Sequence, residues 1–147
     1  MRKSTPWGMA DHEKELADGI VVYSTPSHGG IHLSPERQKV LQRAVKFNTF
    51  AGGPWYEEDC DVAVVYLVFH EEFALERVKA AFEAAQTFRG WEARDGRTNG
   101  NWHKVVKWAE NNPCIQDRIR SDSLGMKDFR ASEDGVSVSD VAKILAE

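Results

Sequence analysis

The chain changes its hydrophobic pattern at Ser34 and Pro35, and this change constrains its fold more than any other feature. Before it, the Asp18-Gly19 dipeptide is typical of a hairpin turn, and residues 20–23 are β-branched or aromatic, as in strands. After it, apolar residues recur at helical spacing to about residue 47. Ser34 is a typical helix N-cap, and Pro35 suits the first helical position because it has no N–H to leave unsatisfied. The pattern therefore predicts short strands followed by a helix.

A length of 147 residues fits a single domain. Together with the change of pattern, it predicts an α+β fold in which a small antiparallel β-hairpin sheet over residues 14–33 packs against three to four helices. Residues 1–12 are expected to form an N-terminal arm, and residues 34–110 to be mainly helical. Residues 111–147 are expected to form a loosely packed tail that ends in a short helix.

Residues 61–69 allow two interpretations. Their four valines favour a buried strand. The length of the apolar run and the acids before it, placed where a helix dipole favours them, indicate a buried helix that starts near Glu57. We prefer the helix. The remaining expectations are helices over residues 71–86 and 102–110 and loops over residues 48–56 and 92–101.

The composition argues against several classes of protein. A net charge of −4 gives no strong signal for binding duplex nucleic acid. The sequence has no run of about 18 apolar residues, so we expect no membrane span. Residues 1–16 have no apolar stretch after their basic residues, so we expect no secretory signal and an intracellular location.

Residues 24–34 hold the densest set of candidate functional residues. A Gly-Gly pair next to a histidine lets the backbone approach a ligand closely, or hold an anion with its N–H groups. His28 and His32 are four residues apart on a strand or turn, so they need not converge on one metal ion. In the alternative interpretation the glycines only make a hairpin turn and His28 hydrogen-bonds to nearby backbone. The candidate ligand-binding residues here are His28, Gly29, Gly30 and His32.

Residues 57–61 contain four acids, Glu57, Glu58, Asp59 and Asp61. If His28 bound a metal or acted as a base, the first three of these carboxylates would be its obvious partners. A site with both histidines and one carboxylate is conceivable. In the alternative interpretation the acids only anchor the start of a helix.

The cysteines and the common enzyme motifs argue against several reactions. Cys60 lies between two acids, which raise the pKa of a thiol and make it a poor nucleophile, and Cys114 has no adjacent base. The sequence holds no Gly-x-Ser-x-Gly elbow, no P-loop, no dinucleotide glycine fingerprint and no Cys-x-x-Cys. We expect no resident cofactor or metal, and a binding role in preference to catalysis.

A basic stretch interleaved with aromatic residues follows the acidic one. Its cations, together with Trp102, could pair with phosphate and stack on a base, as in nucleotide sites. In the alternative interpretation the charges form a solvated surface, and we expect Trp91 and Trp108 to lie in the core. Trp7 and Trp55 are expected to cover the sheet. The cations are Arg89, Arg94, Arg97, Lys104 and Lys107.

Three segments together resemble a known family. They read TPWG at residues 5–8, STPSHGG at residues 24–30 and YEEDC at residues 56–60. In this order they are similar to an uncharacterised family, a domain of unknown function from bacteriophages, plasmids and proteobacterial genomes, and the likeness spans about residues 5–90. The resemblance implies a genomic context and no catalytic residues.

That context implies an accessory protein of a phage or mobile element that acts by binding in the host bacterial cytoplasm. In the first hypothesis it inhibits a host-defence protein by protein binding, or sequesters a nucleotide signal. In the second it is a small hydrolase, with or without a metal, that uses His28 with Glu57, Glu58 or Asp59. The second gains support if His28 lies within hydrogen-bond or shared-metal reach of one of these carboxylates in a concave pocket, and a separation above about 10 Å would exclude it. In the third it is a structural or regulatory partner in a phage assembly.

Overall fold

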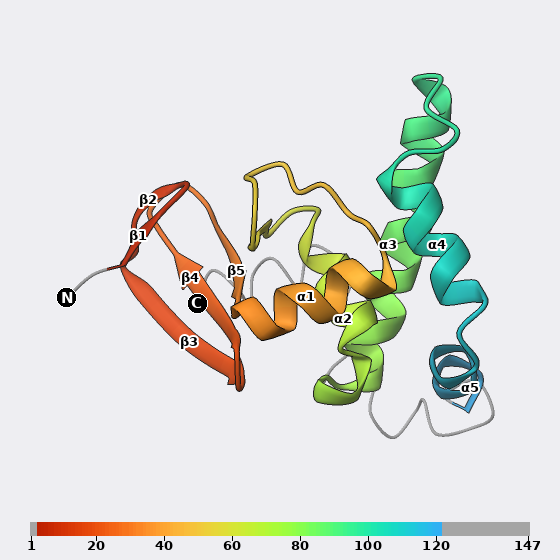
Figure 1. Ribbon diagram of the computed structural model, residues 1–147, viewed down its shortest axis with the longest axis horizontal. Coiled ribbons are helices and arrows are strands. Elements are labelled where there is room, and N and C mark those ends of the chain that lie inside the picture. The colour runs from red at the N-terminus through yellow and green to blue at the C-terminus, as the bar shows by residue number, and fades with distance from the viewer. Residues whose placement is uncertain (1–2, 122–147) are drawn as a thin grey trace.

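The computed structural model describes residues 3–121, and these have an α+β fold, as predicted. The described part contains a two-stranded and a four-stranded antiparallel sheet, five α-helices and one 3-10 helix. Figure 1 shows the strands at one end of the molecule and helices α3 (Leu75–Arg94), α4 (Asn101–Glu110) and α5 (Pro113–Ser121) at the other, with α1 (Pro35–Ala44) between them. No helix within residues 3–121 is long and apolar enough to cross a membrane. The predicted final helix lies outside the described residues.

The sheet region is more extensive than the predicted hairpin. β1 (Ser4–Thr5) pairs with β2 (Gly8–Met9), so the expected arm forms a small ribbon of its own. The main sheet has the strand order β3-β4-β5-β6. Its strands are β3 (His12–Ala17), β4 (Ile20–Ser24), β5 (Gly29–Leu33) and β6 (Trp55–Glu57).

Strand β6 corrects the prediction of a loop over residues 48–56. Three residues are too few to show the period of two by which strands are recognised. The strand exists because it pairs with β5, where Tyr56 lies opposite Ile31 and Glu57 lies opposite Gly30. This contact between distant segments leaves no local signature in the sequence.

One face of the main sheet belongs to the hydrophobic core. Ile20 lies opposite Leu33 and Ile31 lies opposite Tyr56, and all four side chains are fully buried. Cross-strand partners share a face, so these residues form one apolar surface. Helix α2 (Val62–Val68) belongs to the same core, and it is buried along almost its whole length.

Helices α1 and α2 confirm two predictions and correct one boundary. α1 (Pro35–Ala44) begins as expected, with the Ser34 hydroxyl accepting a hydrogen bond of 3.2 Å from the Arg37 N–H. Residues 62–68 are helical, as we preferred, but α2 starts at Val62 and not near Glu57. Glu57 is instead held in β6, and a turn separates the strand from the helix.

Helix α3 (Leu75–Arg94) continues past the predicted end at residue 86 and into the predicted loop. Its last turns contain Glu92, which is buried and accepts a hydrogen bond of 2.9 Å from the Trp102 N–H at the start of α4. α4 (Asn101–Glu110) matches its predicted range closely. The charged residues at the end of α3 are typical of a loop, but the segment is helical and is held by the hydrogen bond from α4 to Glu92.

Helix α5 (Pro113–Ser121) corrects the prediction of a loosely packed tail for the part of it that the structure describes. Ile115 is fully buried. The Arg118 guanidinium donates hydrogen bonds to the backbone carbonyls of His70 and, at 3.0 Å, Phe73. These residues belong to, or follow, the 3-10 helix η1 (His70–Glu72), so α5 is bonded to the segment between α2 and α3.

Candidate metal centre

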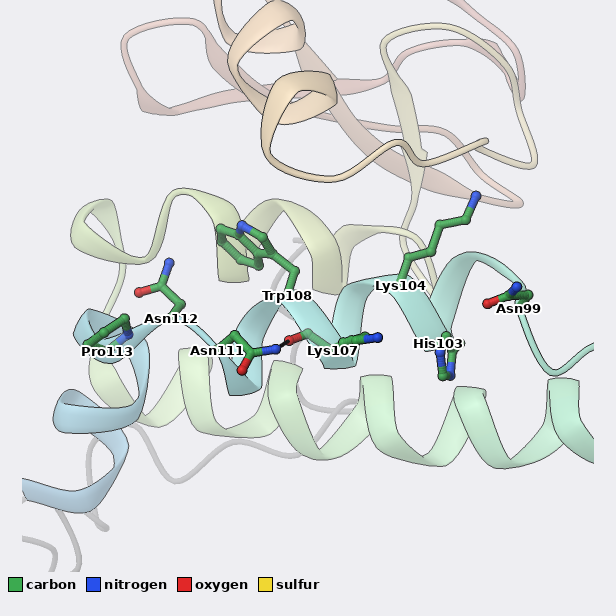
Figure 2. Close-up of a pocket in the computed structure, with 8 residues that line it drawn as sticks. All are labelled: Asn99, His103, Lys104, Lys107, Trp108, Asn111, Asn112 and Pro113. Carbon is green, nitrogen blue, oxygen red and sulfur yellow. Dashed lines mark hydrogen bonds between the residues drawn. The ribbon is translucent and has the colours of Figure 1, made fainter.

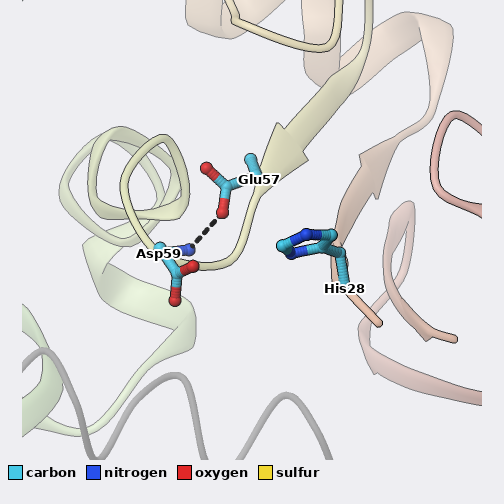
Figure 3. Close-up of side chains that lie close together, drawn as sticks. All are labelled: His28, Glu57 and Asp59. Carbon is cyan, nitrogen blue, oxygen red and sulfur yellow. Dashed lines mark hydrogen bonds between the residues drawn. The ribbon is translucent and has the colours of Figure 1, made fainter. Parts of the chain in front are cut away.

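Three side chains from two distant segments converge beside the main sheet. His28 lies in the turn before β5, Glu57 ends β6, and Asp59 lies in the turn before α2. One imidazole nitrogen and one oxygen from each carboxylate all lie within 4.8 Å of one another. Figure 3 shows the imidazole facing the two carboxylates from the opposite side of the cluster. Two of the carboxylate partners that we predicted for His28 are therefore within reach of it.

A short turn holds the backbone of His28. The Thr25 hydroxyl accepts a hydrogen bond of 3.1 Å from the His28 N–H and donates one of 2.7 Å to the His28 carbonyl oxygen. The Thr25 N–H also donates to that carbonyl, at 2.8 Å. The backbone position is therefore fixed while the imidazole is exposed.

The carboxylates are positioned by the turn that follows β6. The Glu58 N–H donates to the Gly29 carbonyl at 3.0 Å, which extends the pairing with β5 by one residue. The Glu57 carboxylate accepts a hydrogen bond of 2.9 Å from the Asp59 N–H. This bond folds the chain back, so that Glu57 and Asp59 lie on the same side of the turn, facing His28 (Figure 3).

Gly29 and Gly30 lie in strand β5 and do not form the hairpin turn of the alternative interpretation. A Cβ on Gly30 would lie 2.2 Å from the Tyr56 carbonyl oxygen of β6, and one on Gly29 would lie 2.6 Å from the Tyr23 carbonyl oxygen of β4. Gly30 therefore allows β6, and Gly29 allows β4, to approach β5 closely.

The cluster concentrates negative charge in a partly buried place. Burial raises the pKa of Glu57 above its usual value, and the nearby charge of Asp59 adds to this. Burial also raises the pKa of Glu58, with further contributions from Asp59 and Glu57. For both carboxyl groups, the charge of His28 acts in the opposite direction. A bound cation would relieve this repulsion.

The two residues after Asp59 have other roles. Burial and the charges of Asp61 and Glu57 raise the pKa of the Cys60 thiol to about 12, which confirms that it is a poor nucleophile. Asp61 is buried, and its carboxylate accepts a hydrogen bond of 2.8 Å from the Phe50 N–H. Burial raises the pKa of this carboxyl group to about 6. Asp61 thus anchors the loop before β6 and does not face His28.

His32 does not join His28 in a two-histidine site. Among the described residues, the donor atoms that converge with the His28 imidazole are those of Glu57 and Asp59, and His32 is not among them. The His32 ring instead lies 4.5 Å from the Trp55 ring, and Trp7 packs edge-on against Trp55 at 5.8 Å. The Trp7 ring also lies over Gly30. Trp7 and Trp55 therefore cover the sheet, as predicted.

The basic stretch separates into two groups. Lys104 and Lys107 line a cavity along α4, whereas Arg94 and Arg97 are exposed around the connection from α3 to α4, where Arg97 pairs with Asp95 at 3.2 Å. Arg89 is half-buried on α3 and does not line this cavity.

Two tryptophans lie in places other than those expected from the sequence, and a third lies only partly in the core. Trp102 was expected to stack on a ligand, but it is buried between the rings of Phe47 and Phe88. Trp91 was expected in the core, but it is 51% exposed. Trp108 packs in part against the core, as expected, and it also lines the cavity with His103, although neither residue is among the candidate site residues predicted from the sequence. Their spacing from Lys104 and Lys107, four residues in each case, is the signal that could have identified them.

The fold and the cluster define a small α+β protein with a candidate metal centre that joins a strand end to the turn before a buried helix. The chain belongs to the family described as Domain of unknown function (DUF7007), whose sequence profile matches residues 1–110. No curated protein and no solved structure matches the chain.

Proposed function

We propose that this chain binds a divalent transition-metal ion through His28, Glu57 and Asp59 and uses it in hydrolysis. The observation that carries this proposal is the convergence of one nitrogen and two carboxylate oxygens within 4.8 Å. Ligands at about 2.0–2.2 Å from a shared ion lie at most about 4.4 Å apart, so a small rotation of the exposed imidazole completes the geometry.

The donor set favours some metals over others. One imidazole with two carboxylates suits Zn²⁺, Mn²⁺ or Fe²⁺, whereas Mg²⁺ and Ca²⁺ prefer sites built from oxygen alone. Affinities for such sites rise from Mn²⁺ and Fe²⁺ towards Zn²⁺. We therefore expect Zn²⁺ to bind more tightly than Mn²⁺.

Hydrolysis is the reaction class that this donor set supports best. Three protein ligands leave a coordination position open for water, as in catalytic zinc sites. Glu58 lies next to the cluster, and its charge interacts with His28, Glu57 and Asp59. A metal held by His28, Glu57 and Asp59 would supply a polarised water, and Glu58 would be the neighbouring carboxylate to accept a proton from that water and return it to the leaving group.

The metal proposal is tested by isothermal titration calorimetry with ZnCl₂ and MnCl₂ on the wild-type chain and two variants. His28→Ala removes the nitrogen ligand. Glu57→Gln keeps an oxygen that can accept the Asp59 N–H but removes the charge. Losing an outer partner of a ligand already costs about 10–100-fold in affinity, so losing a ligand should raise Kd by more than about tenfold.

The matched controls are His12→Ala and Glu15→Gln, which change exposed residues of β3. They should leave Kd within about twofold of the wild type. An equal rise in the Kd for the metal in the control variants, or no metal binding by the wild-type chain, would refute the metal site. Cleavage of p-nitrophenyl acetate and bis(p-nitrophenyl) phosphate by the zinc-loaded chain then tests hydrolysis, which should be lost in His28→Ala and kept in His12→Ala.

Binding to a host-defence protein, a role in a phage assembly and a cytoplasmic location stay predictions from the sequence. The first hypothesis also includes the sequestration of a nucleotide, for which a cavity along α4 is a separate candidate site.

A further inference from the structure

A second candidate site lies at the helical end of the molecule. A cavity of about 590 Å³ runs along α4 to the start of α5. In Figure 2 the side chains of Lys104 and Trp108 extend from the same side of α4, one turn apart. None of the eight described residues that line it is acidic. They are Asn99, His103, Lys104, Lys107, Trp108, Asn111, Asn112 and Pro113.

The charge of this groove suits an anion. Lys104 and Lys107 are three residues apart, so their side chains lie on neighbouring positions of one helical surface. Both are exposed, and within residues 3–121 neither has a carboxylate partner. Two ammonium groups in one groove, without a carboxylate partner among the described residues, would attract a phosphate-bearing ligand.

The groove also offers an aromatic surface. Trp108 packs in part against the hydrophobic core, which limits its movement, while the rest of its side chain lines the groove. An indole held in this way can stack on a flat ring. The amides of Asn99, Asn111 and Asn112 supply hydrogen-bond donors and acceptors of the kind that recognise base edges.

We infer that this groove binds a nucleotide, with Lys104 and Lys107 at the phosphates and Trp108 stacked on the base. Its volume falls within the range of about 300–1,000 Å³ that small-ligand sites occupy. An acidic peptide such as oligoglutamate would also pair with the lysines, but it has no aromatic ring to stack on the indole of Trp108. The site is separate from the metal centre and does not depend on it.

The test is calorimetric titration with ATP, tripolyphosphate and adenosine in buffer that contains EDTA, which keeps metal from the His28 cluster. ATP should bind, and tripolyphosphate and adenosine should each bind at least about tenfold more weakly, because each lacks half of the recognised groups. His28→Ala should leave ATP affinity unchanged. The failure of either proposal is thus distinguishable from the failure of the other.

Charge-reversal variants locate the site. Lys104→Glu/Lys107→Glu should weaken ATP binding at least about tenfold, and Trp108→Phe should weaken ATP binding while leaving tripolyphosphate binding unchanged. The matched control is Lys39→Glu/Lys46→Glu, which makes the same change of charge at exposed lysines of α1 and the segment after it.

Four results would each overturn the inference. They are the absence of ATP binding in EDTA, a loss of ATP affinity in Lys39→Glu/Lys46→Glu equal to that in Lys104→Glu/Lys107→Glu, tripolyphosphate binding as tightly as ATP, and an oligoglutamate peptide binding more tightly than ATP.

Discussion

The strand end and the helical end of this molecule carry candidate sites of opposite charge that are assembled in different ways. At the strand end, His28 lies close to Glu57 and Asp59 only because β5 pairs with β6. In the sequence, α1 and the loop after it separate these two strands. At the helical end, Lys104, Lys107 and Trp108 belong to one helix and share a groove by spacing alone. The first site therefore depends on sheet pairing, and the second depends on a single helix and its contacts.

The largest effect should come from a substitution that separates β5 from β6. A Cβ at Gly30 would lie 2.2 Å from the Tyr56 carbonyl oxygen and 2.6 Å from the Trp7 ring, and backbone cannot move aside as a flexible side chain can. We expect Gly30→Ala to lower the free energy of unfolding by about 3 kcal/mol, as measured by urea denaturation.

Gly90→Ala is the matched control at the helical end. Gly90 is exposed within α3, and a Cβ there would meet nothing within 4 Å. Alanine has the higher helix propensity, so this variant should be more stable by about 0.5–1 kcal/mol. If Gly30→Ala were as stable as the wild type, this would contradict the close approach of β6 to Gly30 on which the strand-end site depends.

The second prediction concerns the junction that positions the groove. Glu92→Ala removes the carboxylate that accepts the Trp102 N–H and so leaves that buried donor unsatisfied. We expect a loss of about 2 kcal/mol in the free energy of unfolding, comparable to the loss of a helix cap. Glu83→Ala, at an exposed position of the same helix, should change it by less than about 0.5 kcal/mol. Similar effects of the two variants would show that α3 does not hold α4 in this way.

The smallest effect should be a dependence of stability on pH at the helical end. Burial and the nearby charge of Arg118 lower the pKa of His70, so its neutral form is favoured in the folded chain. The unfolded chain then binds more protons, and stability is lost as pH falls from about 6.5 towards the folded pKa. Urea denaturation at pH 7.5 and pH 5.0 should show a smaller difference for His70→Gln than for the wild type. An unchanged difference would contradict this assignment.

The comparison also explains how far the sequence could be interpreted. The cap at Ser34, the Asp18-Gly19 hairpin and the helix at residues 102–110 are specified by neighbouring residues, and each was predicted. β6 and the end of α3 were missed, because the first is defined by its pairing with β5 and the second by the bond from Trp102 to Glu92.

The candidate sites follow the same distinction. His28 and its possible carboxylate partners could be proposed from residue type, but only the strand pairing selects Glu57 and Asp59 and removes His32. The lysines of the groove were found from local charge. Trp102 was chosen in place of Trp108 because charge and aromatic content do not show which side of a helix faces the core.

The bonds from Arg118 to the backbone of His70 and Phe73 bear on where this structural unit ends. The family profile stops at residue 110, yet α5 buries Ile115 and satisfies two carbonyl groups of the segment between α2 and α3. A fragment cut at the family boundary would expose an apolar surface and strip those carbonyls of their partners. The folding unit is therefore larger than the shared sequence, and any transplant of this domain into another protein should carry residues 111–121 with it.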